Sequence, residues 1–327
     1  LDAATRADSL TGVLKLKALR IEARTLQGRA LLADGQSAAG LAALRDAVRL
    51  AAANPSTEAL LETNLALGRG LELAGRRADV VAAYDRAAMA VERMTAGLNE
   101  DQHRTGFKEQ HLAPFDGALR VLLTGGGSPA DAEAALAWSA RRKAAALTLA
   151  GAPGAGPVRR LSVASLRSRI RADEALIDYS VVDSTAWAIV VRPGSIRSFA
   201  LRATSSQLAT WVAAIRRPLV ATPGGRIDLA HARFNVAAAE SLYHALITPL
   251  RAALGNAKSL AIAPDGALWY VPFAALVTGR ANGRVSYLIE RHEVRLLPSA
   301  QFLGRRDGNA LPAGFRVDAL SYSVPGG

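Results

Sequence analysis

A spacing of 40 residues recurs in the first part of the chain and constrains its fold more than any other feature. Gly28 and Gly68 are 40 positions apart. The same offset relates four further pairs of residues: Leu31 with Leu71, Gly35 with Gly75, Leu44 with Tyr84, and Ala47 with Ala87. The intervening residues are mostly strong helix formers, with apolar residues three and four apart. This period predicts repeated helical hairpins, whereas an ordinary antiparallel helical bundle, the alternative, needs no period.

Helix-breaking residues divide residues 1–150 into helices of ordinary length. They stand at Asp34-Gly35, Asn54-Pro55, Ala74-Gly75 and 125–129. In the last of these, Ser128 is suited to cap a helix whose first residue is Pro129. A third, degenerate hairpin is therefore expected from about Asp101 to Leu149, and residues 1–150 are predicted to form one helical repeat domain.

A Gly- and Pro-rich linker is predicted over residues 151–160. It is not a phosphate-binding loop, because Pro157-Val158 stands where such a loop needs Lys and then Ser or Thr. The following pattern predicts a mixed-sheet α/β module over residues 161–327. Its expected helices span 162–172, 204–220 and 231–254. Its expected strands span 175–182, 186–191 and 196–201 as an antiparallel meander, then 259–263, 285–290 and 293–297.

Composition excludes several kinds of chemistry. The chain has no cysteine, which rules out disulfides, thiolate metal sites and a cysteine nucleophile within it. The net charge is +12, but the Arg residues are dispersed, as in Arg141-Arg142, and aromatic residues are scarce. We interpret the basic residues as solvated surface charge rather than a nucleic-acid interface. No cofactor motif is present.

The five histidines suggest neither a metal site nor a catalytic centre. None of them lies in a cluster with metal-ligand spacing, and we expect surface or packing roles, with His292 exposed between strands. The set comprises His103, His111, His231, His244 and His292.

The ends of the chain and its hydropathy bear on its location. No signal peptide is visible, and no apolar run approaches the roughly 20 residues that a membrane helix needs. A cytoplasmic protein without membrane contact is expected. The chain begins with Leu1 and ends in Pro325-Gly326-Gly327, which suggests a piece cut from a longer protein.

The second half resembles the CHAT family, whose caspase-like modules are fused to tetratricopeptide (TPR) arrays. The resemblance rests on residues 165–179, on LYHALITPL at 242–250, on LAIAPDGALWYVPFAAL at 260–276, and on YLIE at 287–290 followed by Pro298-Ser299. The hairpins resemble TPR units, most clearly over residues 65–87. The helix over 132–149 is similar to the one that joins TPR arrays to CHAT modules.

The resemblance implies that recognition and catalysis lie in different parts of the parent protein. The family's catalytic His and Cys lie in motifs that are not found here, so residues 161–327 would correspond to the non-catalytic, pseudo-caspase part. This chain is then expected to be inactive alone, as the recognition and scaffold portion of a cysteine endopeptidase whose catalytic half is missing. The Pro264-Asp265-Gly266 and Pro272-Phe273 segments are interpreted as structural.

A TPR groove would bind a partner protein or peptide. The resemblance places seven residues in it: Glu22, Thr25, Arg29, Glu62, Leu65, Arg69 and Glu72. Glu and Arg suit charged peptide segments, although ordinary pairing along helix surfaces would explain the same residues. The alternatives are a non-enzymatic TPR scaffold and, third, an Arg-rich module that associates with nucleic acid.

Overall fold

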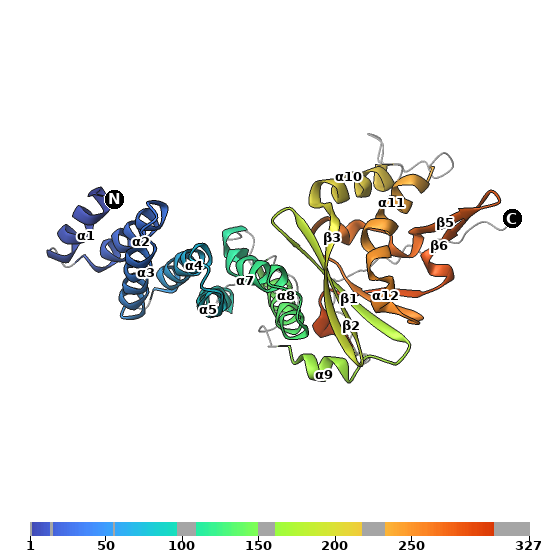
Figure 1. The fold of residues 1–327 in the computed structure, drawn as a ribbon, viewed down its shortest axis with the longest axis horizontal. Coiled ribbons are helices and arrows are strands. Elements are labelled where there is room, and N and C mark those ends of the chain that lie inside the picture. Colours follow the sequence, from blue (N-terminus) through green and yellow to red (C-terminus); the bar gives the residue numbers. More distant parts are fainter. Residues whose placement is uncertain are drawn as a thin grey trace.

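The computed structural model describes residues 2–13, 16–54, 56–96, 109–149, 161–217 and 233–303. Its N-terminal part is an elongated array of helices that leads into an α/β module (Figure 1). The helical elements of the array are α1 (Asp2–Val13), α2 (Lys17–Ala33), α3 (Ser37–Ala52), α4 (Thr57–Leu73), α5 (Arg77–Ala96), η1 (Glu109–Leu112), α7 (Ala113–Thr124) and α8 (Pro129–Leu149).

The 40-residue period corresponds to two hairpins with the same packing. A Cβ atom on Gly28 of α2 would lie 2.6 Å from Leu44 of α3, and one on Gly68 of α4 would lie 2.5 Å from the ring of Tyr84 on α5. Both values are too short for a real contact, so the glycines are needed for close approach of the paired helices.

The turns inside these two hairpins also share one geometry. Gly35 and Gly75 have φ angles of +78° and +67°, a region that favours glycine. The N–H groups of Gly35 and Gln36 donate to the carbonyls of Leu32 and Leu31, which satisfies the end of α2 as a Schellman motif. The expected helix, glycine turn and second helix are therefore present in both units.

The third hairpin is formed by α7 and α8. Ser128 caps α8 as expected, because the N–H of Asp131 donates to its Oγ at 3.1 Å. The ring of Tyr84 lies against a second glycine here, since a Cβ on Gly117 of α7 would come within 2.5 Å of it. The start of the expected hairpin at 101–108 and the linker at 151–160 lie outside the described residues.

The main sheet is mixed and has the strand order β3-β2-β1-β4-β7. Strands β1 (Glu174–Val182), β2 (Thr185–Arg192) and β3 (Ser195–Thr204) form the predicted antiparallel meander. Strands β4 (Ser259–Ala263) and β7 (Glu293–Leu296) run parallel to β1. A separate antiparallel pair, β5 (Val277–Ala281) and β6 (Arg284–Tyr287), forms a small second sheet.

Helices cover both faces of the main sheet (Figure 1). Alternate residues of β1 serve the two sides: Leu176 packs in the cluster that includes α7 and α8, and Ile177 packs in the cluster with the later helices. The first cluster is continuous from α3 through α8 to the sheet. The helical array and the sheet therefore share one hydrophobic core.

The remaining helical elements are α9 (Val163–Arg167), α10 (Ser205–Arg216), α11 (Val236–Leu246), η3 (Thr248–Leu250), α12 (Arg251–Leu254), η4 (Gly266–Tyr270), η5 (Phe273–Ala275), η6 (Leu288–Glu290) and η7 (Ala300–Phe302).

Several predicted boundaries were wrong. The helix expected over 162–172 is only α9, because the chain then turns through shorter-range bonds and buries Ile170. The helix expected over 231–254 is interrupted after Leu246, where Pro249 lacks the N–H that a continuous helix needs. The strand expected over 285–290 ends at Tyr287, whose N–H is taken by the Glu290 carboxylate at 2.8 Å. Strand β5 was not among the predicted strands.

Candidate functional site

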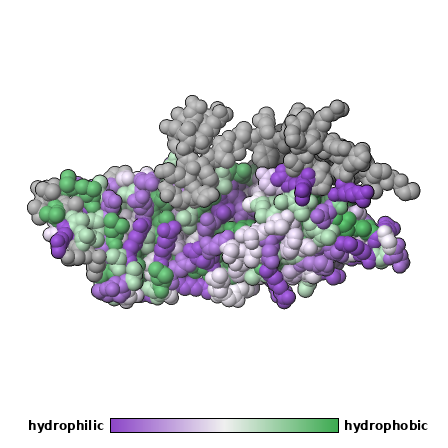
Figure 2. Space-filling view, turned by 90° about the horizontal axis from the view of Figure 1, so that it is seen from above, coloured by the Kyte–Doolittle hydropathy of each residue, from purple (hydrophilic) through white to green (hydrophobic). Residues whose placement is uncertain are grey.

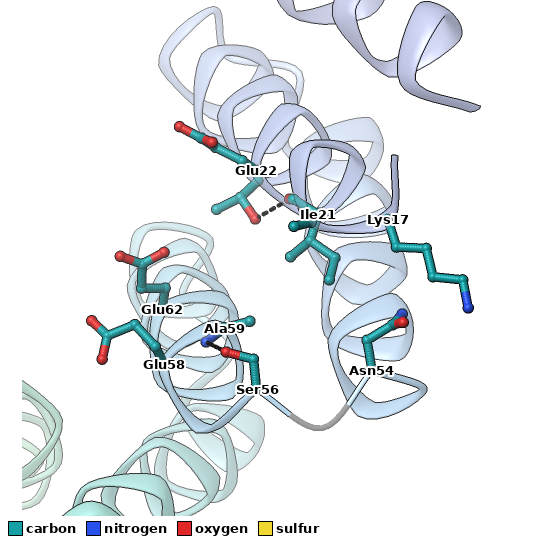
Figure 3. A pocket seen from close by; sticks show the side chains of 10 residues that line it. Lys17, Ile21, Glu22, Asn54, Ser56, Glu58, Ala59 and Glu62 are labelled. Carbon is teal, nitrogen blue, oxygen red and sulfur yellow. Dashed lines mark hydrogen bonds between the residues drawn. The ribbon is translucent and has the colours of Figure 1, made fainter. Parts of the chain in front are cut away.

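A hollow lies between α2 and α4 (Figure 3). We call it the α2–α4 hollow, and its volume is about 360 Å³. Its lining combines small or apolar residues with charged ones: Lys17, Ala18, Ile21, Glu22, Thr25, Asn54, Ser56, Glu58, Ala59 and Glu62. The two helices that form it are the first helices of the two repeated hairpins, which is where the predicted groove was expected.

Local hydrogen bonds fix the walls of the α2–α4 hollow. Ser56 caps α4 by accepting the N–H of Ala59 at 3.3 Å. On the opposite wall, the Thr25 hydroxyl donates to the carbonyl of Ile21 at 2.7 Å, one turn back along α2. Because these polar groups are satisfied within their own helices, the groups left to bind a ligand are the carboxylates, the Lys17 ammonium and the apolar surface.

The structure brings together three of the seven predicted groove residues. Glu22, Thr25 and Glu62 line the α2–α4 hollow. Arg29 and Arg69 are exposed on α2 and α4 but outside the lining.

The other two predicted residues have different surroundings. Leu65 is 9% exposed and belongs to the hydrophobic core. The Glu72 carboxylate pairs with Arg120 of α7 at 2.7 Å and accepts the Tyr84 hydroxyl at 2.7 Å. Both residues therefore make contacts inside the molecule.

Glu72 also connects the array to the sheet. Its partner Arg120 reaches Asp183, in the turn between β1 and β2, at 3.1 Å. Burial raises the pKa of the Glu72 carboxyl, but hydrogen bonds from Arg120 and Tyr84 outweigh it, so the pKa lies below its ordinary value of 4.5. The ionised form is thus the one that stabilises the folded chain.

We expect Glu72→Gln to destabilise the chain by about 1 kcal/mol at neutral pH, because a charged hydrogen-bond acceptor is lost at a partly exposed position. A carboxyl with a depressed folded pKa contributes its full stability above its unfolded pKa. The difference between wild type and variant should therefore persist down to about pH 4.5 and shrink below it. Urea unfolding over a pH series measures this. The control, Glu62→Gln, removes an exposed glutamate and should change the free energy of unfolding little. Equal destabilisation by the two substitutions would contradict the role of Glu72.

A second polar feature, which sequence reasoning missed, centres on three consecutive basic residues of α8. Arg141 pairs with Asp85 and Glu92 of α5, at 2.6 Å and 2.8 Å. Its guanidinium also lies over the ring of Trp138, 4.5 Å from the centroid. Arg141 therefore ties α8 back to the second hairpin.

The next two residues tie α8 forward to the sheet. Arg142 pairs with Asp116 of α7 at 2.6 Å and with Asp265, after β4, at 2.9 Å. Lys143 pairs with Asp178 of β1 at 2.9 Å and also donates to the carbonyl of Ala263 at 3.0 Å. We call Arg141, Arg142 and Lys143 with their acidic partners the α8 joint.

Asp178 lies at the most buried point of the α8 joint, with no exposed surface. Burial raises the pKa of its carboxyl, against the stabilising effects of the Lys143 ammonium and the Ser139 hydroxyl. Ser139 donates to Asp178, and Ser180 donates to Ser139 at 3.0 Å. These bonds match the rule that buried charges are paired and hydrogen-bonded.

The interpretation of Arg141-Arg142 as solvated surface charge was wrong. The side chains of Arg141, Arg142 and Lys143 are 7%, 16% and 6% exposed. A signal was present in the sequence. Three consecutive residues on a helix point in three directions, about 100° apart, so they cannot all lie on one solvated face.

The histidines form no site among the described residues. His292 is half-buried rather than exposed as expected, and burial lowers the pKa of its imidazole. His111 is buried, while His103 and His231 lie outside the described residues. Within the described ranges, no group of three or more His, Asp or Glu side chains is placed to hold a metal ion. No helix in these ranges is long and apolar enough to cross a membrane.

The segment from α11 onward supplies β4, β7 and the Asp265 loop. The loop packs tightly against β1, because Asp265 accepts the N–H of Val181 at 2.8 Å in addition to its pair with Arg142. Residues 236–322 match the CHAT domain family. The comparison with curated proteins gave no match. Asp265 of the CHAT-matching segment thus bonds to both α8 and β1, in addition to the pairing of β4 with β1.

Proposed function

We propose that this chain is the recognition and scaffold portion of a CHAT caspase-like cysteine peptidase, and that its TPR-like hairpins bind a partner protein or peptide. The observation that carries the proposal is the α2–α4 hollow, which opens on an array that packs directly against the sheet of the CHAT-matching segment. The chain contains no cysteine, so a cysteine nucleophile would have to be supplied from outside these residues.

The repeat supports the recognition role. Glu22 and Glu62 occupy equivalent positions, 40 residues apart, and so do Arg29 and Arg69. Like charges therefore recur on the two neighbouring helices α2 and α4. A segment that crosses both helices would meet the same charge twice, and such matching of charge gives specificity to a recognition surface.

The α8 joint and the shared core support the scaffold role. One hydrophobic cluster extends from α3 to the sheet, and Arg141 and Arg142 join α5 to the Asp265 loop through adjacent residues of one helix. A partner held on α2 and α4 would therefore be held in a fixed relation to the CHAT-matching segment. A scaffold without an enzymatic parent would use the same surfaces. Reading the gene past residue 327 separates the two, because a His-Gly pair followed by a Ser-Ala-Cys stretch is expected only of the peptidase.

The recognition role is tested with a double charge reversal, Arg29→Glu with Arg69→Glu. Peptides are first selected from a displayed random library against the full chain, and their affinities are then measured by fluorescence anisotropy. We expect the double variant to change the affinity of the selected peptides about tenfold, weakening acidic peptides and tightening basic ones, since two positive charges become negative. The matched control is Arg202→Glu with Arg291→Glu, two exposed residues of the α/β module. Unaltered affinity in the first variant would overturn the groove assignment.

A further inference from the structure

We propose that the α2–α4 hollow binds a basic segment of the partner, one that inserts arginine or lysine side chains between α2 and α4. This inference rests on the proposed recognition function and names its partner class. It is carried by three observations: the carboxylates at the hollow that are unpaired among the described residues, the pairing of acidic side chains with arginine elsewhere in the array, and the apolar residues of the lining.

Three glutamates face the same side of the gap between the helices. Glu58 and Glu62 lie one turn apart on α4, and Glu22 of α2 extends to the same side of the view (Figure 3). None of the three carboxylates has a hydrogen bond or an ion pair with any of the described residues. Lys17, the one basic residue of the lining, extends to the opposite side of the hollow (Figure 3).

Acidic side chains elsewhere in the array are mostly matched with arginine. Hydrophilic and hydrophobic side chains alternate over the face of the array seen in Figure 2. The described pairs join Asp46 with Arg24 and Arg49, Glu72 with Arg120, Asp79 with Arg76, Asp85 and Glu92 with Arg141, Asp116 with Arg142, and Asp131 with Arg77. In a chain of net charge +12, three unmatched carboxylates around one concavity therefore stand out.

The spacing of the carboxylates favours a cation. Glu58 and Glu62 are an i, i+4 pair of like charge, which destabilises an isolated helix rather than supporting it. A guanidinium or ammonium group beside Glu58 and Glu62 would relieve this repulsion. Arginine fits best, because its planar fork can donate to two carboxylates at once.

The apolar residues of the lining suit the methylene groups of such a side chain. The apolar part of the lining consists of Ala18 and Ile21 of α2 and Ala59 of α4, of which Ile21 is 6% exposed. Long basic side chains bury their methylene groups on apolar surface and keep the charge at the rim. The volume, about 360 Å³, accommodates one or two side chains of a segment rather than a folded domain, and the carboxylates would repel nucleic-acid phosphates.

Fluorescence anisotropy with the full 327-residue chain tests the inference. The probes are two labelled Ala/Gly peptides of equal length, one with two arginines and the other with glutamines in their place. We expect the arginine peptide to bind more tightly, and Glu58→Gln with Glu62→Gln to weaken it about five- to tenfold at low salt. The matched control, Asp34→Asn with Glu293→Gln, makes the same charge change at exposed positions outside the hollow. Its affinity for the arginine peptide should stay within about twofold of the wild-type value.

Equal binding of the two peptides would overturn the inference, and so would equal losses in the two double variants. The outcome is separable from that of the proposed function. If Arg29→Glu with Arg69→Glu abolishes binding of library-selected peptides while Glu58→Gln with Glu62→Gln leaves it unchanged, the array recognises partners but not through a basic segment. If neither double variant affects any peptide, both proposals fail. Binding of a single-stranded oligonucleotide that is lost in Glu58→Gln with Glu62→Gln would also contradict a cationic ligand.

Discussion

Replacing Lys143 with methionine will destabilise the chain by about 3–5 kcal/mol, because the change leaves the buried carboxylate of Asp178 without its cation. The two groups are 2.9 Å apart, and their side chains are 6% and 0% exposed. Methionine keeps most of the volume of lysine, so the effect reports the lost charge rather than a cavity. Urea unfolding monitored by circular dichroism measures it. Lys258→Met, at an exposed lysine, is the control and should stay within about 0.5 kcal/mol.

The pH dependence of this variant has a defined sign. Burial raises the pKa of Asp178, and loss of Lys143 raises it further. A carboxyl with a raised folded pKa binds more protons in the folded state, so stability grows as the pH falls toward its unfolded pKa. The destabilisation by Lys143→Met should therefore be smaller at mildly acidic than at alkaline pH.

A second substitution checks the origin of that effect. Asp178→Asn in the Lys143→Met background removes the uncompensated charge and keeps an acceptor for the Ser139 hydroxyl. We expect it to restore a large part of the lost stability. If the double variant is no more stable than Lys143→Met, the buried ion pair is not the cause.

Gly68→Ala and Gly117→Ala will each destabilise the chain by about 1–3 kcal/mol, as is usual for overpacking in a well-packed core. The new Cβ would lie 2.5 Å from the ring of Tyr84 in both cases, because this ring is held between α4 and α7. Alanine is intrinsically about 1 kcal/mol better than glycine within a helix. A net loss therefore shows that the clash exceeds that gain.

A double-mutant cycle with Tyr84→Leu isolates the contact. The smaller side chain should reduce the cost of Gly68→Ala and of Gly117→Ala, as measured by urea unfolding. Gly194→Ala serves as the control, since a Cβ there has no neighbour within 4 Å. Costs that remain unchanged in the Tyr84→Leu background would show that the two glycines do not serve the close approach of α4, α5 and α7.

Tyr84 and the α8 joint both contribute to the junction between the helical array and the sheet. Tyr84 fixes the packing of α4, α5 and α7, and the α8 joint fixes the last of these hairpins on the sheet. Buried ion pairs are weak evidence for stability, but their loss on one side is costly. The α8 joint therefore favours one relative position of the array and the CHAT-matching segment over others.

The amino-acid sequence was sufficient to predict the features that depend on neighbouring residues. The glycine turns at Gly35 and Gly75, the Ser128 cap and the β1–β3 meander follow from backbone preferences and hydrophobic spacing, which are local, and the period of 40 repeats this local pattern. The sequence also placed Glu22, Thr25 and Glu62 on helices that meet at one hollow. That this hollow binds a partner, and that the hairpins are TPR units, stay predictions.

The partners of the buried charges depend on the packing of segments that are distant in the chain. Lys143 and Asp178 are 35 residues apart in the chain, Arg141 and Glu92 are 49 apart, and Arg142 and Asp265 are 123 apart. No local pattern links such residues, and three consecutive basic residues resemble surface charge until α8 is packed between the array and the sheet. The burial of Leu65 and the pairing of Glu72 with Arg120 have the same reason, because both depend on which distant segments meet.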